Sequence, residues 1–236
     1  TDTVSGFARL FPETFLRYDA VAMRVLSVKA SEGGPLRDLF RTISPEAYQR
    51  AEQTLVSHFV RGDHPRVVAS RLKDELGIPL VRAKTIARTE WLGASNEGSL
   101  AVYRANSDIV TKWRWTATLS TRTCAACLAL DGKEFELDKP FGQHPNCRCT
   151  CVPVTVSWEE LGYDVADRRP VLKTGESWFK DLPERSQRRV LTDPRKFRLW
   201  KEGRISLMDL VDTKTHSVYG VTRREKSTKA VLVGLR

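Results

Sequence analysis

The sequence lacks long hydrophobic runs, and it has no cysteine outside one short window. Uninterrupted apolar segments are only a few residues long, whereas a membrane-spanning helix needs roughly 20. No transmembrane role is therefore expected. The opening segment also lacks a basic stretch followed by an apolar core, so no secretory signal is predicted. With 41% hydrophobic and 29% charged residues, the 236-residue composition is typical of a globular protein with a substantial core.

Several enzyme signatures are also missing. There is no glycine-rich phosphate loop, no G-x-S-x-G elbow and no His-Glu-x-x-His pair, which argues against nucleotide hydrolases, serine esterases and common zinc proteases. The zinc deaminase signature, in which His-x-Glu precedes Pro-Cys-x-x-Cys, is absent as well. His58, His64 and His216 stand apart in sequence from plausible catalytic partners. We therefore expect no catalytic residues.

Acidic residues are scarce only in the C-terminal third, where basic residues outnumber them. The range 168–236 holds 18 Lys+Arg against 8 Asp+Glu, whereas the range 1–167 holds 21 of each, so the whole net charge of +10 lies in the last third. Such an excess favours a polyanionic partner, either nucleic acid or an acidic protein surface. A solvated basic face without a partner is the alternative. The residues expected to make this contact are Arg185, Arg188, Arg189, Arg195, Lys196, Arg198, Arg223, Arg224 and Lys226.

All five cysteines lie between positions 124 and 151, together with one of the four histidines. An odd number of closely spaced thiols in a chain without an export signal indicates a metal site in a reducing compartment, not a disulfide framework. Zinc prefers four tetrahedral thiolate and imidazole ligands, and two residues between two cysteines let a tight turn direct both sulfurs at one ion. The predicted zinc ligands are Cys124, Cys127, His144, Cys147 and Cys149.

Five candidates exceed the four ligands that zinc needs, and the sequence leaves open which four bind. If a strand begins at Arg148, Cys147 and Cys149 lie on one face of it and either can reach the ion. Cys151 lies farther along and is interpreted as a small core residue. Because a catalytic zinc keeps an open position and this cluster offers surplus donors, the ion is expected to be structural.

The first hundred residues predict a helical bundle. Helices are expected at Glu13 to Ser31, from the Ser44-Pro45 cap to about Val60, from Asp63 to Gly77, and at about Leu80 to Asn106. The last of these has an alanine-rich stripe at helical spacing, which lets another element approach closely. Glu90 and Glu97 project near this stripe and need partners if they are buried.

The middle of the chain predicts a small antiparallel sheet. Trp113, Trp115, Ala117 and Leu119 alternate with polar residues, as in a half-buried strand, so the tryptophans are expected in the core; stacking on nucleic-acid bases is the alternative. Asp131-Gly132 predicts a type I′ hairpin leading into a strand over 133–137, and the range 148–156 alternates again.

After residue 157 the pattern returns to short helices, predicted at 183–191, 194–201 and 206–211. The basic tail from Thr215 to Arg236 is either an extended arm or a terminal strand. The predicted fold class is α+β, with an N-terminal helical bundle, a zinc-stapled antiparallel sheet in the middle, and short helices with a basic tail at the C-terminus. The domains are 1–108 (helical), 109–157 (zinc-binding sheet) and 158–236 (basic, helical).

Several motifs occur in an order that resembles a known family. These are Ala87-Arg88-Thr89-Glu90 with Asn96, Trp113-Arg114-Trp115-Thr116-Ala117-Thr118, Arg122-Thr123-Cys124-Ala125-Ala126-Cys127 with Leu130-Asp131-Gly132-Lys133, and His144-Pro145-Asn146-Cys147-Arg148-Cys149. Trp178-Phe179, Leu182, Gln187, Trp200-Lys201 and Gly203-Arg204 follow. The pattern is similar to the phage head morphogenesis proteins, also called minor head or Mu F-like minor capsid proteins. Members often have Asp where this chain has Ser120-Thr121, so any role of that acid is missing here.

The resemblance implies a non-enzymatic virion protein that acts at the portal and capsid interior in head assembly and in DNA packaging or delivery. It implies portal or major capsid protein and the double-stranded DNA genome, bound without sequence specificity, as partners, and neither a membrane nor a small-molecule substrate. The expected location is the virion or procapsid interior near the portal vertex, and the host cytoplasm during assembly. A zinc-dependent nucleic-acid-processing enzyme, with Glu90 or Glu97 as general base, is the alternative, and a cytosolic zinc-ribbon adaptor is a third.

Overall fold

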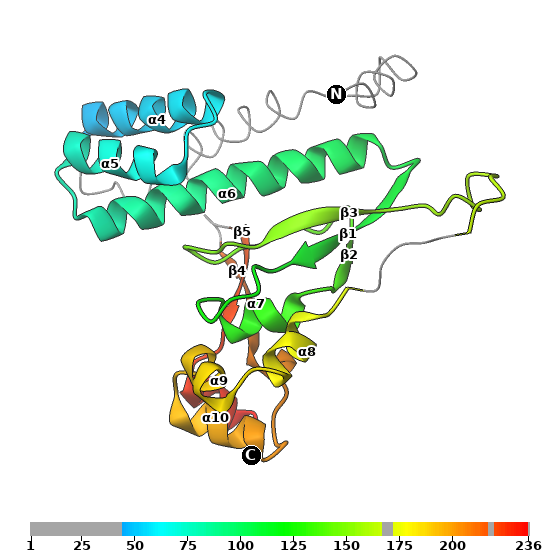
Figure 1. The fold of residues 1–236 in the computed structure, drawn as a ribbon. Helices are drawn as coiled ribbons and strands as arrows, with labels where there is room; N and C mark the ends of the chain where they lie inside the picture. Colours follow the sequence, from blue (N-terminus) through cyan, green and yellow to red (C-terminus); the bar gives the residue numbers. More distant parts are fainter. Residues whose placement is uncertain (1–43, 167–171, 217–219, 236) are drawn as a thin grey trace.

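The computed structural model describes residues 44–166, 172–216 and 220–235, and Figure 1 shows how they are arranged. This described part contains eight α-helices and two small antiparallel sheets, which confirms the predicted α+β class. The helix predicted at Glu13 to Ser31 lies outside it. Among the described helices, none combines the length and apolar character needed to cross a membrane.

Three helices form the N-terminal layer, and their ends follow the capping signals of the sequence. Ser44 Oγ accepts a hydrogen bond from Ala47 N at the start of the first helix, and His64 Nδ1 accepts one from Arg66 N at the start of the second. Gly77 ends the second helix in the left-handed conformation, at φ 63°. The helices are α4 (Pro45–Val60), α5 (Pro65–Leu76) and α6 (Leu80–Ala105).

Small side chains let these helices pack closely. Ala51 of α4, Ala69 of α5 and Ala83, Ala87 and Ala94 of α6 are fully buried in one hydrophobic cluster. The first half of the predicted alanine-rich stripe is therefore the face through which α6 contacts the other two helices. The rest of α6 extends beyond them and lies over the sheet (Figure 1).

The three-stranded antiparallel sheet has the order β2-β1-β3. Its central strand confirms the predicted alternation, because Trp113 and Trp115 are fully buried, whereas Lys112 and Arg114 form cross-strand ion pairs with glutamates of β2. Trp115 stacks on Phe141 with ring centroids 4.1 Å apart. Both tryptophans therefore pack in the core. The strands are β1 (Val110–Thr116), β2 (Glu134–Glu136) and β3 (Thr150–Thr155).

A short helix that the sequence did not predict, α7 (Ala125–Leu130), follows β1, and all six of its residues are buried. The turn after it is not the predicted type I′ hairpin. Asp131 has φ −58° and Gly132 has φ 81°, whereas a type I′ turn needs a positive φ at both positions. Asp131 is held in place because its Oδ1 accepts a 2.6 Å hydrogen bond from Ala117 N. A type II turn thus joins α7 to β2.

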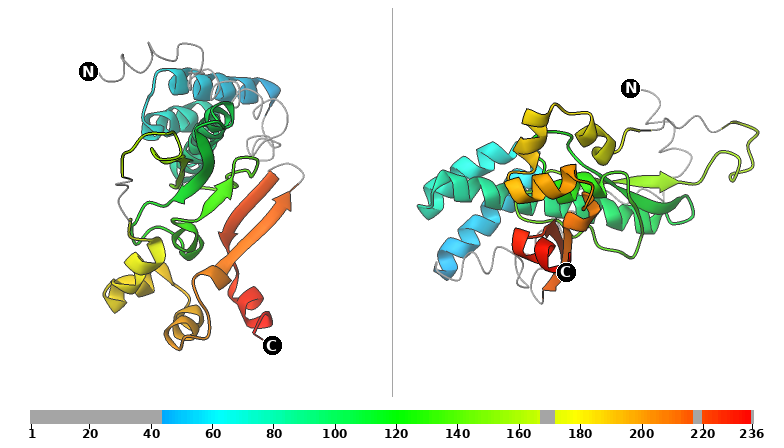
Figure 2. Two further views of the ribbon diagram at one scale, coloured as in Figure 1. Left: turned by 90° about the vertical axis from the view of Figure 1, so that its right-hand side faces the viewer. Right: turned by 90° about the horizontal axis from the view of Figure 1, so that it is seen from below.

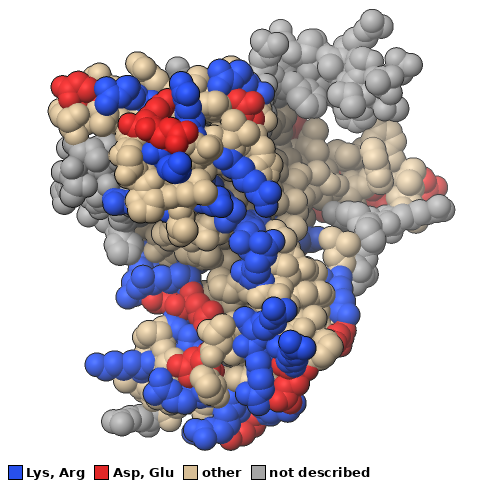
Figure 3. Space-filling view, turned by 60° about the vertical axis from the view of Figure 1, so that its left-hand side comes forward, with Lys and Arg blue, Asp and Glu red and all other residues tan. Residues whose placement is uncertain are grey.

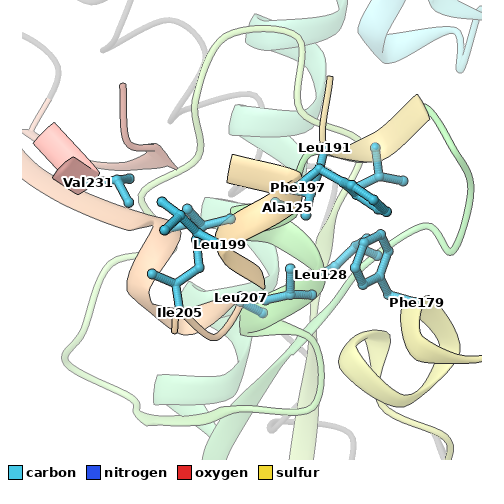
Figure 4. Close-up of a cluster of buried hydrophobic side chains, with 12 residues drawn as sticks. Ala125, Leu128, Phe179, Leu191, Phe197, Leu199, Ile205, Leu207 and Val231 are labelled. Atoms are coloured by element: carbon cyan, nitrogen blue, oxygen red, sulfur yellow. The ribbon is translucent and has the colours of Figure 1, made fainter. Parts of the chain in front are cut away.

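The C-terminal third packs onto α7 through a shared hydrophobic cluster (Figure 4). Leu128 of α7 belongs to it together with Phe179, Leu191, Phe197 and Leu207, all of them buried. Side chains from both sides of residue 158 thus share one hydrophobic cluster. The helices of this part are α8 (Gly175–Lys180), α9 (Glu184–Val190) and α10 (Pro194–Lys201).

The last residues form a hairpin and a short helix. The strands β4 (Val211–His216) and β5 (Gly220–Glu225) pair antiparallel, beside the three-stranded sheet in Figure 2, and α11 (Thr228–Val233) follows. The helix predicted over 206–211 is only one 3-10 turn, η1 (Met208–Leu210), because Val211 already begins β4. Of the two alternatives for the tail, a strand is correct for Gly220–Glu225, whereas Thr228–Val233 is helical.

Candidate metal centre

All five predicted metal ligands lie together between α7 and the loop that precedes β3. His144 Nε2 is 3.4 Å from Cys124 Sγ and 3.2 Å from Cys127 Sγ, and Cys127 Sγ is 3.8 Å from Cys147 Sγ. Cys124, Cys127 and His144 form one group, and Cys127, Cys147 and Cys149 form a second, each with donor atoms within 4.8 Å of one another. Because Cys127 belongs to both groups, the five donors make a single cluster that could hold a metal ion.

Local backbone structure positions the donors. Cys124 is the N-cap residue of α7 and Cys127 lies in its first turn, so a helix start, not the expected tight turn, brings their sulfurs together. On the other side, Cys149 N donates a 3.5 Å hydrogen bond to Cys147 Sγ. Cys147 and Cys149 precede β3, which begins at Thr150, so they do not share a strand face as expected.

The donor set fits a zinc-type ion. Zinc–sulfur bonds of about 2.3 Å in a tetrahedron place two sulfurs about 3.8 Å apart, which matches the separation of Cys127 and Cys147. His144 Nδ1 lies 2.8 Å from Pro145 O; an N–H donated there leaves Nε2 free to face the sulfurs. Trp115 Nε1 is buried without a hydrogen-bond partner among the described residues, and it lies near Cys149, whose sulfur could accept a hydrogen bond from this N–H in the thiolate form.

The pKa values reflect the crowding of these groups. Contacts with the thiol of Cys127 and with His144 together lower the pKa of Cys124 to about 5, against the effect of burial. Contacts with Cys124, Cys147 and Cys149, together with burial, raise the pKa of Cys127. Burial alone would lower the pKa of His144, but the sulfurs of Cys124 and Cys147 raise it to about 11. Without a metal, the cluster therefore holds both thiolates and protons.

Metal binding is expected to weaken as the pH falls. At pH 7 the metal-free protein keeps protons on Cys127 and His144, whose pKa values are raised, and the metal must displace both. Affinity should thus fall about a hundredfold per pH unit below pH 7, and more steeply below the pKa of Cys124 at about 5, where a third proton competes. Zinc titrations against a competing chelator at several pH values measure this slope; a pH-independent affinity would exclude these ligands.

Helix α6 fixes the ligand loop through one buried amide. Asn96 is 1% exposed; its Nδ2 donates to Cys149 O at 3.2 Å and to Gln143 Oε1 at 3.2 Å. Its Oδ1 accepts from Cys151 N at 3.2 Å and from Thr150 Oγ1 at 3.0 Å. Both faces of the amide are thus satisfied by the segment that carries the metal ligands. Asn96 thereby places this segment relative to the helical layer.

A second contact holds the tip of the same loop. Asn146 has φ 63°, the left-handed conformation that asparagine tolerates better than most residues. Its backbone N–H donates to Thr89 Oγ1 at 2.9 Å, and Arg88 donates a hydrogen bond to its side-chain oxygen. Partial burial lowers the pKa of Arg148, which follows in the loop, and the like charges of Arg88 and Arg122 lower it further.

The C-terminal hairpin supports the loop from another side. Arg223 is 8% exposed, and its guanidinium donates to Pro140 O at 2.8 Å and to Phe141 O. Arg223 N also donates to Gly142 O at 2.6 Å. Burial lowers the pKa of Arg223. These contacts connect β5 to the backbone just before His144.

Replacing Gly142 by alanine should destabilise the protein by about 2–3 kcal/mol. Gly142 has φ 64°, and a Cβ there would lie 2.6 Å from the guanidinium of Arg223 and 3.0 Å from Val221 O. Gly77→Ala is the matched control, because Gly77 has φ 63° but nothing within 4 Å of the added Cβ. Urea unfolding should show the control losing only about 1 kcal/mol. Equal losses in both variants would mean that the hairpin contact is loose.

The basic residues predicted to contact a polyanion are in two kinds of environment. Lys196 and Arg223 are buried; Lys196 Nζ is 2.6 Å from Glu225 Oε1 and donates to Lys226 O. These two side chains therefore make internal contacts. The remaining seven are exposed or half-buried, namely Arg185, Arg188, Arg189, Arg195, Arg198, Arg224 and Lys226. Figure 3 shows Lys and Arg on much of one face, interspersed with acidic residues.

The acids considered as general bases lie on α6 and do not belong to either metal-ligand group. Glu90 is buried and Glu97 is half-buried. Cys151 also lies outside the two groups, buried against Asn96, and burial raises its pKa to about 12. Its expected place in the core agrees with this burial.

Four residues that support the ligand loop had no signal of their own in the sequence. Arg88, Thr89 and Asn96 contact the loop from α6. Their only signal in the sequence is that they belong to a motif shared with the phage head morphogenesis proteins. No periodicity or spacing indicated the part played by Arg223, whose partner Phe141 is 82 residues away.

Comparison with protein families gave one match. Residues 49–152 match the family model described as "Phage Mu protein F like protein". The matched range contains most of α4, the helices α5 and α6, the strands β1 and β2, and the whole cysteine and histidine cluster. Neither a search of curated proteins nor a search of solved structures gave a match.

Proposed function

Since residues 49–152 carry the pattern of the phage Mu protein F like proteins, a phage head morphogenesis family, we propose that this chain is a non-enzymatic minor head protein. The observation that supports this most is that the matched range contains the whole cysteine and histidine cluster. The match ends at Val152, just after the last cysteine, and it includes the residues of α6 that hold the ligand loop. The matched range thus carries the candidate metal centre together with its support from α6.

In this proposal the centre is a structural zinc site with the ligands Cys124, Cys127, His144 and Cys147. The imidazole of His144 contacts Cys124, Cys127 and Cys147, whereas Cys149 contacts the sulfurs of Cys127 and Cys147 but not the imidazole. When bound, the ion supplies cross-linking between α7 and the ligand loop. The cysteines are at least nine-tenths buried except Cys124, and surplus donors leave no position for water or substrate. This enclosure favours a structural ion over the catalytic one of the alternative enzyme.

We further propose that the protein acts inside the virion or procapsid near the portal vertex, with portal or major capsid protein as partner. Residues 1–108 would dock there, 109–157 would hold the centre, and the basic face of 158–236 would contact double-stranded DNA. The seven accessible basic residues of the C-terminal third support the DNA contact. Deleting the range from Arg168 onward is not a clean test, because it would expose the cluster around Leu128.

Co-expression with the portal and major capsid proteins of the same phage tests the proposal. We expect the chain to co-elute with one of them on size exclusion. Cys151→Ala, outside the metal cluster, should keep this association, whereas Cys127→Ala should lose it together with the metal. If the chain elutes alone in the presence of both proteins, and heads form normally without it, the proposed role is wrong.

A further inference from the structure

Three arginines gather around the ligand loop on the outside of the metal centre. Arg88 of α6 donates to the side chain of Asn146, Arg148 follows Asn146 by two residues, and the guanidinium of Arg148 donates to Arg122 O at 3.4 Å. Arg122 is exposed, and Arg88 and Arg148 are half-buried. We refer to Arg88, Arg122 and Arg148 as the arginine triad. The triad lies outside the basic C-terminal third, in the part of the chain with zero net charge.

No carboxylate balances the triad. Across residues 44–166, 172–216 and 220–235, none of its three guanidiniums has an aspartate or glutamate oxygen within ion-pair distance. Other arginines of this part do form ion pairs, for example Arg71, Arg114 and Arg188. Like charges held together in this way repel each other unless an anion neutralises them. Two of the three guanidiniums are held by hydrogen bonds, that of Arg88 to the side chain of Asn146 and that of Arg148 to Arg122 O, so these two are positioned before any ligand arrives.

The thiolates of the metal centre do not account for this charge. A divalent ion bound to three thiolates and one imidazole has a single net negative charge, which one guanidinium can offset. Two positive charges remain. Guanidinium groups bind phosphate oxygens through paired N–H donors, and several of them together suit a chain of phosphates better than an isolated carboxylate.

We propose that Arg88, Arg122 and Arg148 form a phosphate-binding site for the backbone of double-stranded DNA. This site deepens the proposed function, because it rests on a DNA contact, but it uses residues on the metal centre and none of the C-terminal basic face. Contacts of this kind carry no sequence information and fix how the protein sits on the duplex. The metal centre would then have two roles, to staple the fold and to present the triad.

The test compares three variants with equal charge loss by fluorescence anisotropy with a labelled, mixed-sequence DNA duplex. The first is the triad variant R88Q/R122Q/R148Q. The second is the C-terminal variant R185Q/R189Q/R198Q. The third is the control R50Q/R66Q/K133Q, which removes exposed charges on α4, α5 and the turn before β2. Metal content and thermal melting are measured for each.

The triad variant should raise the Kd about tenfold or more and reduce the slope of log K against log salt by about 2–3, whereas the control should change neither appreciably. An unchanged slope in a folded, metal-loaded triad variant overturns the site; if the C-terminal variant then loses binding, the proposed DNA contact itself survives. If the wild-type protein binds no DNA, both the phosphate-binding site and the proposed DNA contact are wrong.

If the triad variant loses its metal, the single variant R122Q tests the site instead, because the Arg122 side chain makes no hydrogen bond in the described structure. It should reduce the slope by about 1, and no reduction refutes the site.

Discussion

Replacing Cys127 by alanine is expected to abolish metal binding and to unfold the middle of the protein. Cys127 belongs to both groups of donors, and its sulfur contacts His144 and Cys147. A structural zinc contributes on the order of 10 kcal/mol to apparent folding free energy at neutral pH, which is comparable with the entire stability of a typical domain. Elemental analysis should find no stoichiometric zinc in the variant, and circular dichroism should show loss of its cooperative thermal transition.

Cys151→Ala is the matched control for this variant. Cys151 is as buried as Cys127 but lies outside both donor groups, against Asn96. Removing its sulfur should cost about 1–2 kcal/mol, as for other small losses of buried volume, and the metal should remain. A Cys127→Ala protein that keeps its zinc and melts like the control would show that the ion is not held by this cluster.

Replacing Asn96 by aspartate is expected to destabilise the protein by about 3–5 kcal/mol, although the two side chains have nearly the same shape. The change places a carboxylate oxygen against Cys149 O and Gln143 Oε1, where the amide now donates two hydrogen bonds. A buried carboxylate is costly when one of its oxygens faces only acceptors, and the repulsion acts directly on the segment that carries the ligands. Urea unfolding at neutral pH measures the loss.

The pH dependence of the Asn96→Asp variant distinguishes this mechanism from general damage. Burial among acceptors raises the pKa of the new carboxyl in the folded state, so the folded state binds its proton more tightly than the unfolded state does. Relative to wild type, the variant should therefore regain stability as the pH falls from the folded pKa towards the unfolded value of about 3.9. Asn106→Asp, at the C-terminal end of α6, should cost less than about 1 kcal/mol. Equal losses in the two variants would contradict the role assigned to Asn96.

Local sequence signals predicted the regular elements and the ligand cluster well. The Ser44-Pro45 cap, the glycine at 77 and the alternation around Trp113 each depend on interactions within a few residues, and the structure has α4, the end of α5 and β1 where they were expected. The metal donors were identifiable because the chemistry of zinc restricts both the residue types and their spacing. In such places the local pattern determines the outcome.

Contacts between segments far apart in the sequence could not be predicted from such local patterns. Asn96 and Cys149 are 53 residues apart, and Arg223 and Phe141 are 82 apart, so no periodicity relates them. The helix α7 is too short for a recognisable amphipathic pattern, and its residues are buried because the C-terminal cluster covers them. The burial of Lys196 could not be predicted either, because it depends on a contact with the distant residue Glu225. Glu225 lies on β5, a segment for which the sequence allowed either a strand or an extended arm.

Elemental analysis of the freshly purified, full-length protein tests the central claim most directly. A structural ion shared by α7 and the ligand loop predicts one zinc per chain, retained through gel filtration at neutral pH and lost together with the folded structure when a strong chelator removes it. A folded, cooperatively melting protein that contains no stoichiometric metal, and whose stability is unchanged by zinc and by chelator, would contradict it.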